Sequence, residues 1–309
     1  MRMFPVIPFI LLAAFAFPWD HGPHKGAGRE WWYFSGMLKD QYGKDYSFCY
    51  IILRFLGLKY CLVVSNIVDL GTGRLVFGEV ERCPITIFEK PSDGDWYIGY
   101  LGGRVFVIRI RKPSFSLDLR VRGLKPLVLH GDSGYINMGG KGETSAYYSY
   151  TRMSAEGVMI ARGETLELTG DAWMDHQWGS WSAGSRYDWF SFRFEDTTEL
   201  MLYRFREEDG RPMAEYLTGT YVDRNGNSTV IEDFQANPQD HYWIESDSVK
   251  RYPLRWRVKV PSLGIDVSVE ALAEDQFFWL DERHLIWEGA CRITEGNKKG
   301  YCFLEMAGY

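Results

Sequence analysis

Short runs of β-branched and aromatic residues, separated by turn-forming residues, constrain the fold of this chain more than any other feature of its sequence. The clearest run is Phe115–Arg122, in which every second residue is apolar and the residues between are polar. This period of two is that of a strand with one buried face, and Ile265–Leu272 repeats it. Hairpin-type turn residues occur at Asp223–Gly226 and Pro261–Gly264. After the N-terminal segment we find no helical stripe of three or more turns, so we predict an all-β fold of antiparallel barrels or sandwiches.

The length of the chain, 309 residues, suits two domains of ordinary size or one large β domain. The best boundary is Gly179–Arg186, because this small, polar stretch precedes a fresh series of strands. We therefore predict two domains, residues 18–182 and 183–309, after an N-terminal segment of residues 1–17.

The net charge and the aromatic content of the chain indicate which kind of molecule it can bind. The formal net charge is −6, from 41 acidic and 35 basic residues, without a basic stripe. Nucleic acid is therefore not expected as a partner. Aromatic residues make up 16% of the chain, and they carry large apolar areas that suit half-buried sheets. The composition favours a β protein with an apolar pocket for a hydrophobic small molecule.

The N-terminus has the pattern of an export signal. One arginine precedes the apolar run Phe4–Phe17, which contains the A-x-A sequence Ala14–Ala16. The run is short for a membrane span, which needs about 20 residues. We expect an exported protein, periplasmic, extracellular or tethered to a membrane through its N-terminus. A buried N-terminal strand is the alternative.

Five cysteines leave at least one thiol unpaired. None lies in a C-x-x-C motif, which gives no indication of zinc. If the protein is exported, Cys291 with Cys302 and Cys49 with Cys61 are the disulfide candidates, because each pair flanks a turn. The alternative is that they are small buried hydrophobic residues.

Two stretches concentrate titratable and aromatic side chains. Gly170–Trp181 reads G-D-A-W-M-D-H-Q-W-G-S-W and places Asp175 beside His176. Pro18–Gly36 contains a second concentration of acids, histidines and tryptophans. Our hypothesis is that both face one cavity, with Asp175 and His176 as catalytic residues. The ligand-binding residues would be Asp20, His21, His24, Glu30, Trp31, Tyr148, Trp173 and Trp178.

The chemistry that suits this set is acid-assisted and requires no cofactor. A carboxylic acid in an aromatic-walled pocket stays partly neutral through desolvation, and it can then protonate an alkene carbon. Tryptophan faces stabilise the resulting cation by about 2 kcal/mol or more when desolvated. Asp175 would be the proton donor, and His176 would relay the proton or activate water.

Two other readings of these residues remain open. Asp175 and His176 can form a structural clasp with Arg29 or Arg186, in which case the paired carboxylate has a lowered pKa. Asp20, His21, His24 and Glu30 can also be metal ligands. We do not predict a metal site, because no helix fixes the ligand geometry and zinc sites usually show tighter spacing.

Several motifs resemble the AttH-like/carotenoid 1,2-hydratase family. The resemblance is carried by P-W-D-H-G-P-H and E-W-W-Y-F-S-G within Pro18–Gly36, by Tyr147–Arg152 and by Gly170–Gly179, and it continues to the C-terminal Gly308-Tyr309. It implies two lipocalin-like β-barrel domains packed together. The family includes hydratases of isoprenoid double bonds, fungal cyclases of polyketide–terpenoid chains and proteins loosely called secreted hydrolases.

The resemblance also implies an acid at Asp175, with two departures from the family's hydratases. These carry an aromatic hydroxyl two residues before the acid, where this chain has Trp173, and a His-x-Trp pair where it has Ala146–Tyr148. The departures disfavour carotenoid hydration and leave an acid-assisted reaction open. The two functions to distinguish are a lyase or isomerase acting on a lipophilic, isoprenoid-like molecule, and a non-catalytic lipocalin-like carrier.

Overall fold

The computed structural model describes residues 15–84, 95–140, 142–181, 186–244, 251–280 and 284–309. Within these ranges the helical elements are two single 3-10 turns, η1 (Trp19–His21) and η3 (Pro261–Leu263), and the rest is strands and connections. No helix in the described ranges is long and apolar enough to span a membrane. Of the expected export signal, residues 1–14 lie outside the described residues, so export stays a prediction.

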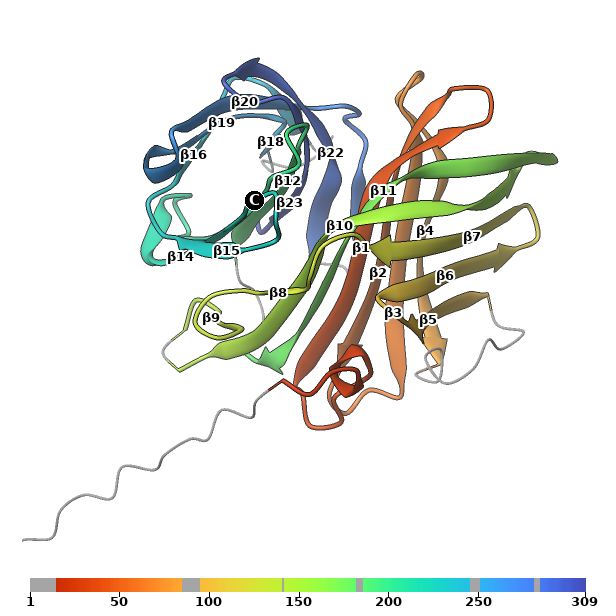
Figure 1. Cartoon of the computed structure of the whole chain (residues 1–309), viewed down its shortest axis with the longest axis horizontal. Coiled ribbons are helices and arrows are strands. Elements are labelled where there is room, and N and C mark those ends of the chain that lie inside the picture. Colours follow the sequence, from red (N-terminus) through yellow and green to blue (C-terminus); the bar gives the residue numbers. More distant parts are fainter. Residues whose placement is uncertain (1–14, 85–94, 141, 182–185, 245–250, 281–283) are drawn as a thin grey trace, which may run out of the picture.

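The first sheet is antiparallel and has eleven strands, with the order β4-β3-β2-β1-β11-β10-β7-β6-β5 and with β8 and β9 paired to β10. It curls strongly, and it is the sheet at the right of Figure 1. Its strands are β1 (Arg29–Asp40), β2 (Asp45–Phe55), β3 (Tyr60–Asp69), β4 (Arg74–Pro84), β5 (Trp96–Gly102), β6 (Val105–Lys112), β7 (Phe115–Gly123), β8 (Val128–Leu129), β9 (Tyr135–Asn137), β10 (Thr144–Ala161) and β11 (Glu164–Ser180).

The second sheet is also antiparallel, has ten strands and follows the order β15-β14-β13-β12-β23-β22-β20-β19-β16, with β21 paired to β22. A small separate sheet pairs β17 (Tyr242–Ile244) with β18 (Arg251–Pro253). The strands of the second sheet are β12 (Tyr187–Phe194), β13 (Glu199–Arg206), β14 (Pro212–Val222), β15 (Ser228–Ile231), β16 (Gln235–Pro238), β19 (Arg255–Val260), β20 (Ile265–Ala271), β21 (Phe277–Trp279), β22 (Leu285–Gly296) and β23 (Gly300–Ala307).

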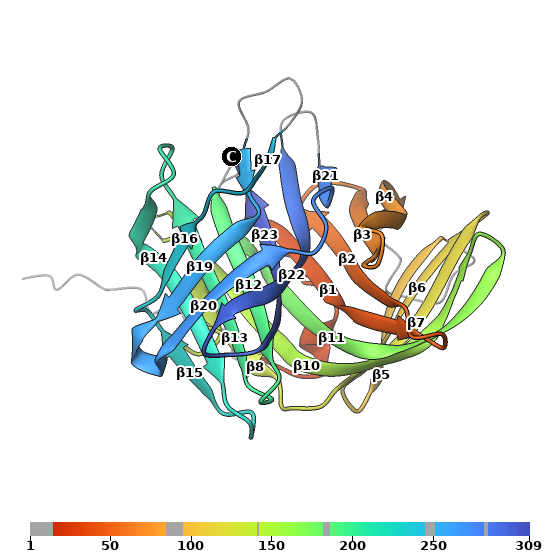
Figure 2. The same ribbon diagram turned by 90° about the horizontal axis from the view of Figure 1, so that it is seen from above.

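The described residues form three apolar cores, of which one joins the two sheets. One fills the inside of the first sheet around Trp32 and Phe48, and a second fills the inside of the other around Phe192 and Trp256. The third lies between the sheets, where β1, β2 and β11 face β12, β22 and β23 (Figures 1 and 2). The expected all-β fold of two curled antiparallel domains is confirmed. The expected boundary lies between the end of β11 and the start of β12, although residues 182–185 are outside the described ranges.

Strand alternation sends neighbouring residues of the two central strands, β1 and β11, into different cores. On β11, Ala172 and Met174 belong to the core inside the first sheet, whereas Trp173 belongs to the core between the sheets. The two middle strands β1 and β11 are therefore buried on both faces, unlike β7, which alternates buried and more exposed residues. Each face of β11 then has its own set of neighbours.

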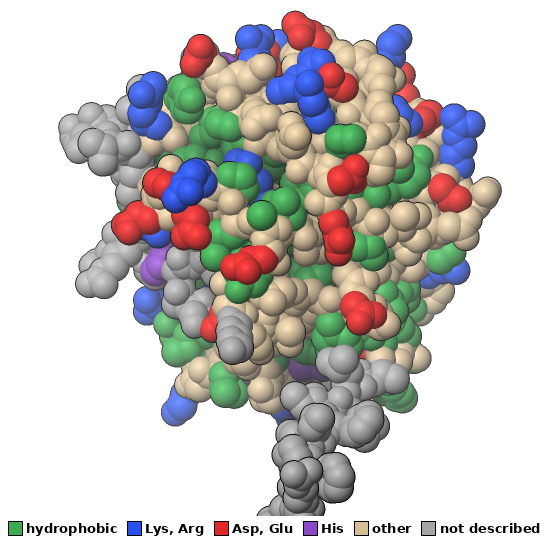
Figure 3. All heavy atoms as spheres, turned by 90° about the vertical axis from the view of Figure 1, so that its left-hand side faces the viewer, with side chains coloured by type: hydrophobic (Ala, Val, Ile, Leu, Met, Phe, Trp, Pro, Cys, Tyr) green, Lys and Arg blue, Asp and Glu red, His purple; other side chains and the backbone are tan. Residues whose placement is uncertain are grey.

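All five cysteines are buried and free in the structure. Cys291 lies directly opposite Cys302 on β22 and β23. The register places Cys83, and not Cys49, opposite Cys61. The surface in Figure 3 carries acidic and basic side chains interspersed with apolar ones, without one sign covering that face.

Candidate functional site

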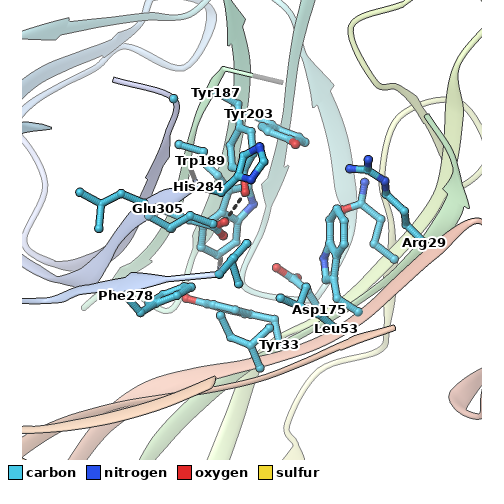
Figure 4. Close-up of a pocket in the computed structure, with 18 of the residues that line it drawn as sticks. Arg29, Tyr33, Leu53, Asp175, Tyr187, Trp189, Tyr203, Phe278, His284 and Glu305 are labelled. Atoms are coloured by element: carbon cyan, nitrogen blue, oxygen red, sulfur yellow. Dashed lines mark hydrogen bonds between the residues drawn. The ribbon is translucent and has the colours of Figure 1, made fainter. Parts of the chain in front are cut away.

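A cavity of about 210 Å³ lies between the two sheets (Figure 4). The first sheet supplies one wall from β1, β2, β10 and β11, and the second supplies the other from β12, β13, β22 and β23. Most of the lining is aromatic or aliphatic, with a few polar groups, which is the usual character of a small-molecule site. The residues that matter below are Arg29, Trp31, Tyr33, Tyr147, Asp175, Tyr187, Trp189, Tyr203, Tyr252, Phe278, His284, Glu305 and Tyr309.

Asp175 projects from β11 into this cavity and is 3% exposed. The indole Nε1 of Trp173 donates a hydrogen bond to its Oδ1 at 2.6 Å, and the hydroxyl of Ser149 donates to the same oxygen. The hydroxyl of Tyr147 donates to Oδ2 at 3.0 Å. Burial raises the pKa of Asp175 to about 7, against the lowering effect of these three neutral donors. Near neutral pH the carboxyl can therefore both give and accept a proton.

A buried polar chain runs from Asp175 to the second sheet. Nε2 of His130 lies 2.7 Å from the Ser149 hydroxyl, and its Nδ1 lies 2.9 Å from the Thr220 hydroxyl on β14. Burial lowers the pKa of His130 to about 3, so this imidazole is neutral and carries one ring hydrogen. When Ser149 donates to Asp175, its oxygen accepts from His130 Nε2 and Thr220 donates to Nδ1. This chain of hydrogen bonds fixes the orientation of the Asp175 carboxyl from the side away from the cavity.

The opposite wall carries a pair of carboxyl groups. Glu305 on β23 lines the cavity, and Glu288 on β22 is its direct cross-strand neighbour. The hydroxyl of Tyr187 donates to Glu305, as Figure 4 shows, and that of Tyr33 donates to Glu288 at 2.6 Å. Burial raises the pKa of both carboxyls, and the nearby charge of Glu305 raises that of Glu288 further.

His176 lies on the other face of β11, where Glu30 forms the centre of a different cluster. Oε1 of Glu30 is 3.0 Å from Nε2 of His176 and 2.7 Å from Nδ1 of His24. The guanidinium of Arg54 donates to Oε2 at 2.6 Å. Burial alone would raise the pKa of Glu30, but the hydrogen bonds and charges of the two imidazoles lower it to about 2. Glu30 is thus an ionised, paired carboxylate.

The hydrogen bonds of this cluster attach the N-terminal residues to one end of the first sheet. His176 Nδ1 lies 2.9 Å from the carbonyl oxygen of Asp20, and the hydroxyl of Tyr148 lies 2.7 Å from His21 Nδ1. The ring of His24 stacks on Trp178 with 3.9 Å between centroids. These contacts are those of a structural clasp. We refer to Asp20, His21, His24, Glu30, Arg54, Tyr148, His176 and Trp178 as the clasp.

The expectation that both motifs face one cavity holds only in part, because Trp31 and Tyr33 of the first motif line the cavity with Asp175, whereas His176 and most of the other expected site residues lie on a different face. Successive side chains of a strand point to opposite faces, so Asp175 and His176 separate although they are adjacent in sequence. Of the expected ligand-binding residues, Trp31 and Trp173 lie on the Asp175 face. The others lie on the His176 face, in the clasp: Asp20, His21, His24, Glu30, Tyr148 and Trp178.

The clasp is also the place where a metal would bind, since ligand atoms of His24, Glu30 and His176 lie within 4.8 Å of one another. The structure favours a hydrogen-bonded clasp there. Arg54 already neutralises Glu30 at 2.6 Å, and a second cation in contact with the same carboxylate would be repelled by the guanidinium.

Several residues of the cavity were missed from sequence alone. Tyr147 and Ser149 had a usable signal, because they alternate with Tyr148 on a strand that precedes the central motif. His130, Glu288 and Glu305 had none, because they come from segments far from Asp175 in the chain. The pairing of β8 with β10 brings His130 to Ser149, and only the packing of the two sheets brings Glu288 and Glu305 to the site.

Comparisons with known proteins agree with this fold. The chain matches the AttH-like family model over residues 86–309. The dehydratase asqC of Emericella nidulans is 20% identical over 191 residues, which cover 59% of this chain and 54% of the relative. The aligned part thus spans about half the length of that dehydratase.

Two solved structures share the whole architecture. A protein of Nitrosomonas europaea, proposed to be an AttH, superposes with a TM-score of 0.82 at 24% identity, over 99% of this chain and 100% of the other. Kievitone hydratase of Nectria haematococca superposes with a TM-score of 0.76 at 18% identity, over 93% and 90%. Because the family model covers most of the sequence, including Asp175 and the entire second sheet, the chain belongs to the AttH-like family.

Proposed function

We propose that this protein is a hydratase or dehydratase, which adds water to or removes it from a carbon–carbon double bond of a lipophilic, isoprenoid-like small molecule. The observation that carries the proposal is Asp175, a buried carboxyl in an aromatic-walled cavity whose pKa is raised to about 7. Such a group is a general acid in its protonated form and a general base in its ionised form, and it works near neutral pH.

The cavity supplies the other requirements of this reaction. Water addition and elimination transfer protons and no net electrons, so the chemistry calls for acid–base groups and not for a redox partner. Trp31 and Trp189 line the cavity together with Asp175 and offer aromatic faces to a developing positive charge. The apolar lining excludes bulk water, which strengthens the electrostatic effect of each polar group.

The comparisons support the same reaction class. One relative is named a dehydratase and one structural neighbour a hydratase, and these names describe opposite directions of one type of reaction. The small and predominantly apolar cavity of this chain supports the proposed lipophilic substrate class.

A carrier that binds a hydrophobic ligand without chemistry is the second candidate, and the aromatic lining favours it equally. One variant separates the two. Asp175→Asn keeps the shape of the side chain but cannot exchange a carboxyl proton. In the hydratase, turnover falls by about 10²–10⁴-fold while the ligand stays bound. In a carrier, there is no turnover to lose.

The test begins with native mass spectrometry of the purified protein, to identify any lipophilic molecule that copurifies. That molecule is then incubated with the protein in ¹⁸O-labelled water. Incorporation of the label, lost in Asp175→Asn and retained in Asp118→Asn, supports the proposal. Asp118 is the matched control because it lies on β7, far from the cavity lining, and is 42% exposed. A bound ligand without label incorporation establishes the carrier.

We also propose that the protein is exported. The described end of the expected signal packs on the clasp, with Phe15 5.4 Å from Trp178 and Phe17 4.9 Å from Tyr148 between ring centroids. Removal of residues 1–16 would retain the contact of Phe17 and lose that of Phe15. N-terminal sequencing of protein from each cell fraction tests this, and an intact N-terminus on cytoplasmic protein contradicts it.

A further inference from the structure

We propose that Glu305, backed by Glu288, is the second proton-transfer group of the cavity and acts from the wall opposite Asp175. The inference rests on the proposed function, because addition or removal of water needs two proton transfers, one at oxygen and one at carbon. Asp175 comes from the first sheet and Glu305 from the second, and both point into the same cavity (Figure 4). The reaction would therefore need both sheets.

The two glutamates differ in how far they reach the cavity. Glu305 lines it and is partly accessible, whereas Glu288 is 0% exposed and lies behind the lining. One oxygen of Glu288, Oε2, has no hydrogen-bond partner among the described residues, although Oε1 accepts from Tyr33. An ionised carboxylate that is buried with one oxygen unpartnered costs free energy, mainly because of its charge. Protonation of Glu288 removes that charge and so reduces the cost.

The surroundings of the pair explain why it should hold a proton. Within the described ranges, no lysine, arginine or histidine forms an ion pair with either carboxyl. Two buried carboxylates side by side cannot both stay ionised cheaply, so one proton is shared between them. The groups that act on the charge of the pair are hydroxyls, thiols and one acid: Tyr33, Cys49, Asp175, Tyr187, Tyr203 and Cys291. Arg29 and His284 also line the cavity, and neither forms an ion pair with Glu305 or Glu288 among the described residues.

The division of work follows from the hydrogen bonds. Asp175 accepts from three donors, which stabilise its anion and make it the better proton donor. Glu305, whose pKa burial also raises to about 7, accepts from Tyr187 alone and faces a second carboxyl that can hold the shared proton, which leaves Glu305 available as the base. Glu288 keeps the proton of the pair and acts as a positioning residue.

In the dehydration direction, ionised Glu305 takes a proton from the carbon next to the carbinol carbon. The C–H electron pair becomes the new π bond as the C–O bond breaks. The departing oxygen takes the proton of Asp175 and leaves as water. That water carries the proton of Glu305 back to Asp175, which restores both groups. Hydration is the same sequence in reverse.

The first test needs no substrate. Infrared difference spectra of the whole protein, with glutamate ¹³C-labelled, should show a carboxylic-acid C=O band that shifts with the label at pH 7. Asp175 is not labelled, so it does not contribute to the shift. The shifting band should disappear in Glu288→Gln and remain in Glu295→Gln, a matched change at an exposed position of the same strand. Absence of a shifting band in the wild-type protein overturns the proposal even if the variants do not fold.

The second test uses the copurified molecule in deuterated water and measures deuterium at carbon. Glu305→Gln should reduce this incorporation by at least about 100-fold, in line with loss of a general base. If Asp175→Asn abolishes turnover and Glu305→Gln does not change it, the second group is wrong and the hydratase stands. If neither substitution changes turnover, the proposed function itself fails. If Glu288→Gln lowers turnover only in proportion to loss of folded protein, Glu288 has no positioning role.

Discussion

Asp175 and Glu30 are buried to nearly the same degree, 3% and 1% exposed, yet the pKa values of their carboxyl groups are shifted in opposite directions. Asp175 has three hydrogen-bond donors, all of them neutral. The effect of burial therefore outweighs theirs, and the pKa of Asp175 is raised to about 7. Glu30 has two imidazoles and Arg54, and its pKa is lowered to about 2. Burial by itself therefore does not make an acid catalyst, because the charge of the partners determines which protonation state survives.

The comparison assigns different functions to the two faces of one pair of strands, β1 and β11. The cavity face has a carboxyl that can exchange protons, and the clasp face has a carboxylate that holds the N-terminal segment. Each prediction below changes one face and uses the other as its reference.

The largest effect on stability should come from Glu30→Gln. This change leaves Arg54 buried without its carboxylate, and breaking a buried ion pair costs about 3–5 kcal/mol. Asp175→Asn should cost no more than about 1.5 kcal/mol, because it disturbs hydrogen bonds from neutral donors. Chemical unfolding of both variants at pH 7 measures the difference. Equal losses of stability in the two variants would mean that Asp175 and Glu30 do not differ in their protonation.

The pH dependence of stability should have opposite signs on the two faces. The folded protein holds the proton of Asp175 more tightly than the unfolded chain, with a pKa of about 7 against 3.8. Its contribution to the free energy of unfolding therefore falls as the pH rises from about 4 to about 7. The folded protein releases the proton of Glu30 more readily, with a pKa of about 2 against 4.5. That contribution is complete above about pH 4.5 and is lost as the pH falls towards 2.

The measurement is the free energy of unfolding against pH for the wild-type protein, Asp175→Asn and Glu30→Gln. The difference between the wild-type protein and Asp175→Asn should decrease between pH 4 and 7. The difference between the wild-type protein and Glu30→Gln should increase between pH 2 and 4.5. A flat difference for Asp175→Asn would show that its carboxyl is already ionised at pH 4.

The smallest effect is expected from a pair of adjacent tyrosines on β10. Tyr147→Phe removes one donor to Asp175, and Tyr148→Phe removes the contact with His21 on the clasp face. Each should cost about 1 kcal/mol of stability, the usual net value of a hydrogen bond. Only Tyr147→Phe should raise the pKa of Asp175, seen as a shift to higher pH of the midpoint of turnover. An equal shift in Tyr148→Phe would mean that the two faces are coupled.

Much of the fold could be predicted from sequence because its signals are local. The two-residue period of Phe115–Arg122 and Ile265–Leu272 reports which face of each strand is buried, and both segments are strands in the structure. The same period also separates Asp175 from His176, as it separates Trp31 from Trp32. The shared acids, histidines and tryptophans of the two motifs had suggested one site. The alternation of side chains along a strand divides these residues between two faces.

The sequence by itself determined that this is an all-β chain, that Asp175 lies among tryptophans in the chain, and that the family is AttH-like. Only the tertiary structure decided what surrounds that acid. Glu305 reaches the cavity, with Glu288 behind it, because the outer faces of two curled sheets pack together, and His130 reaches Ser149 through the pairing of β8 with β10. The pKa of a buried group depends on desolvation and on charges brought from distant strands, and no local pattern in the chain encodes either. For this reason Asp175 and Glu30, in equally aromatic motifs, have pKa values shifted in opposite directions.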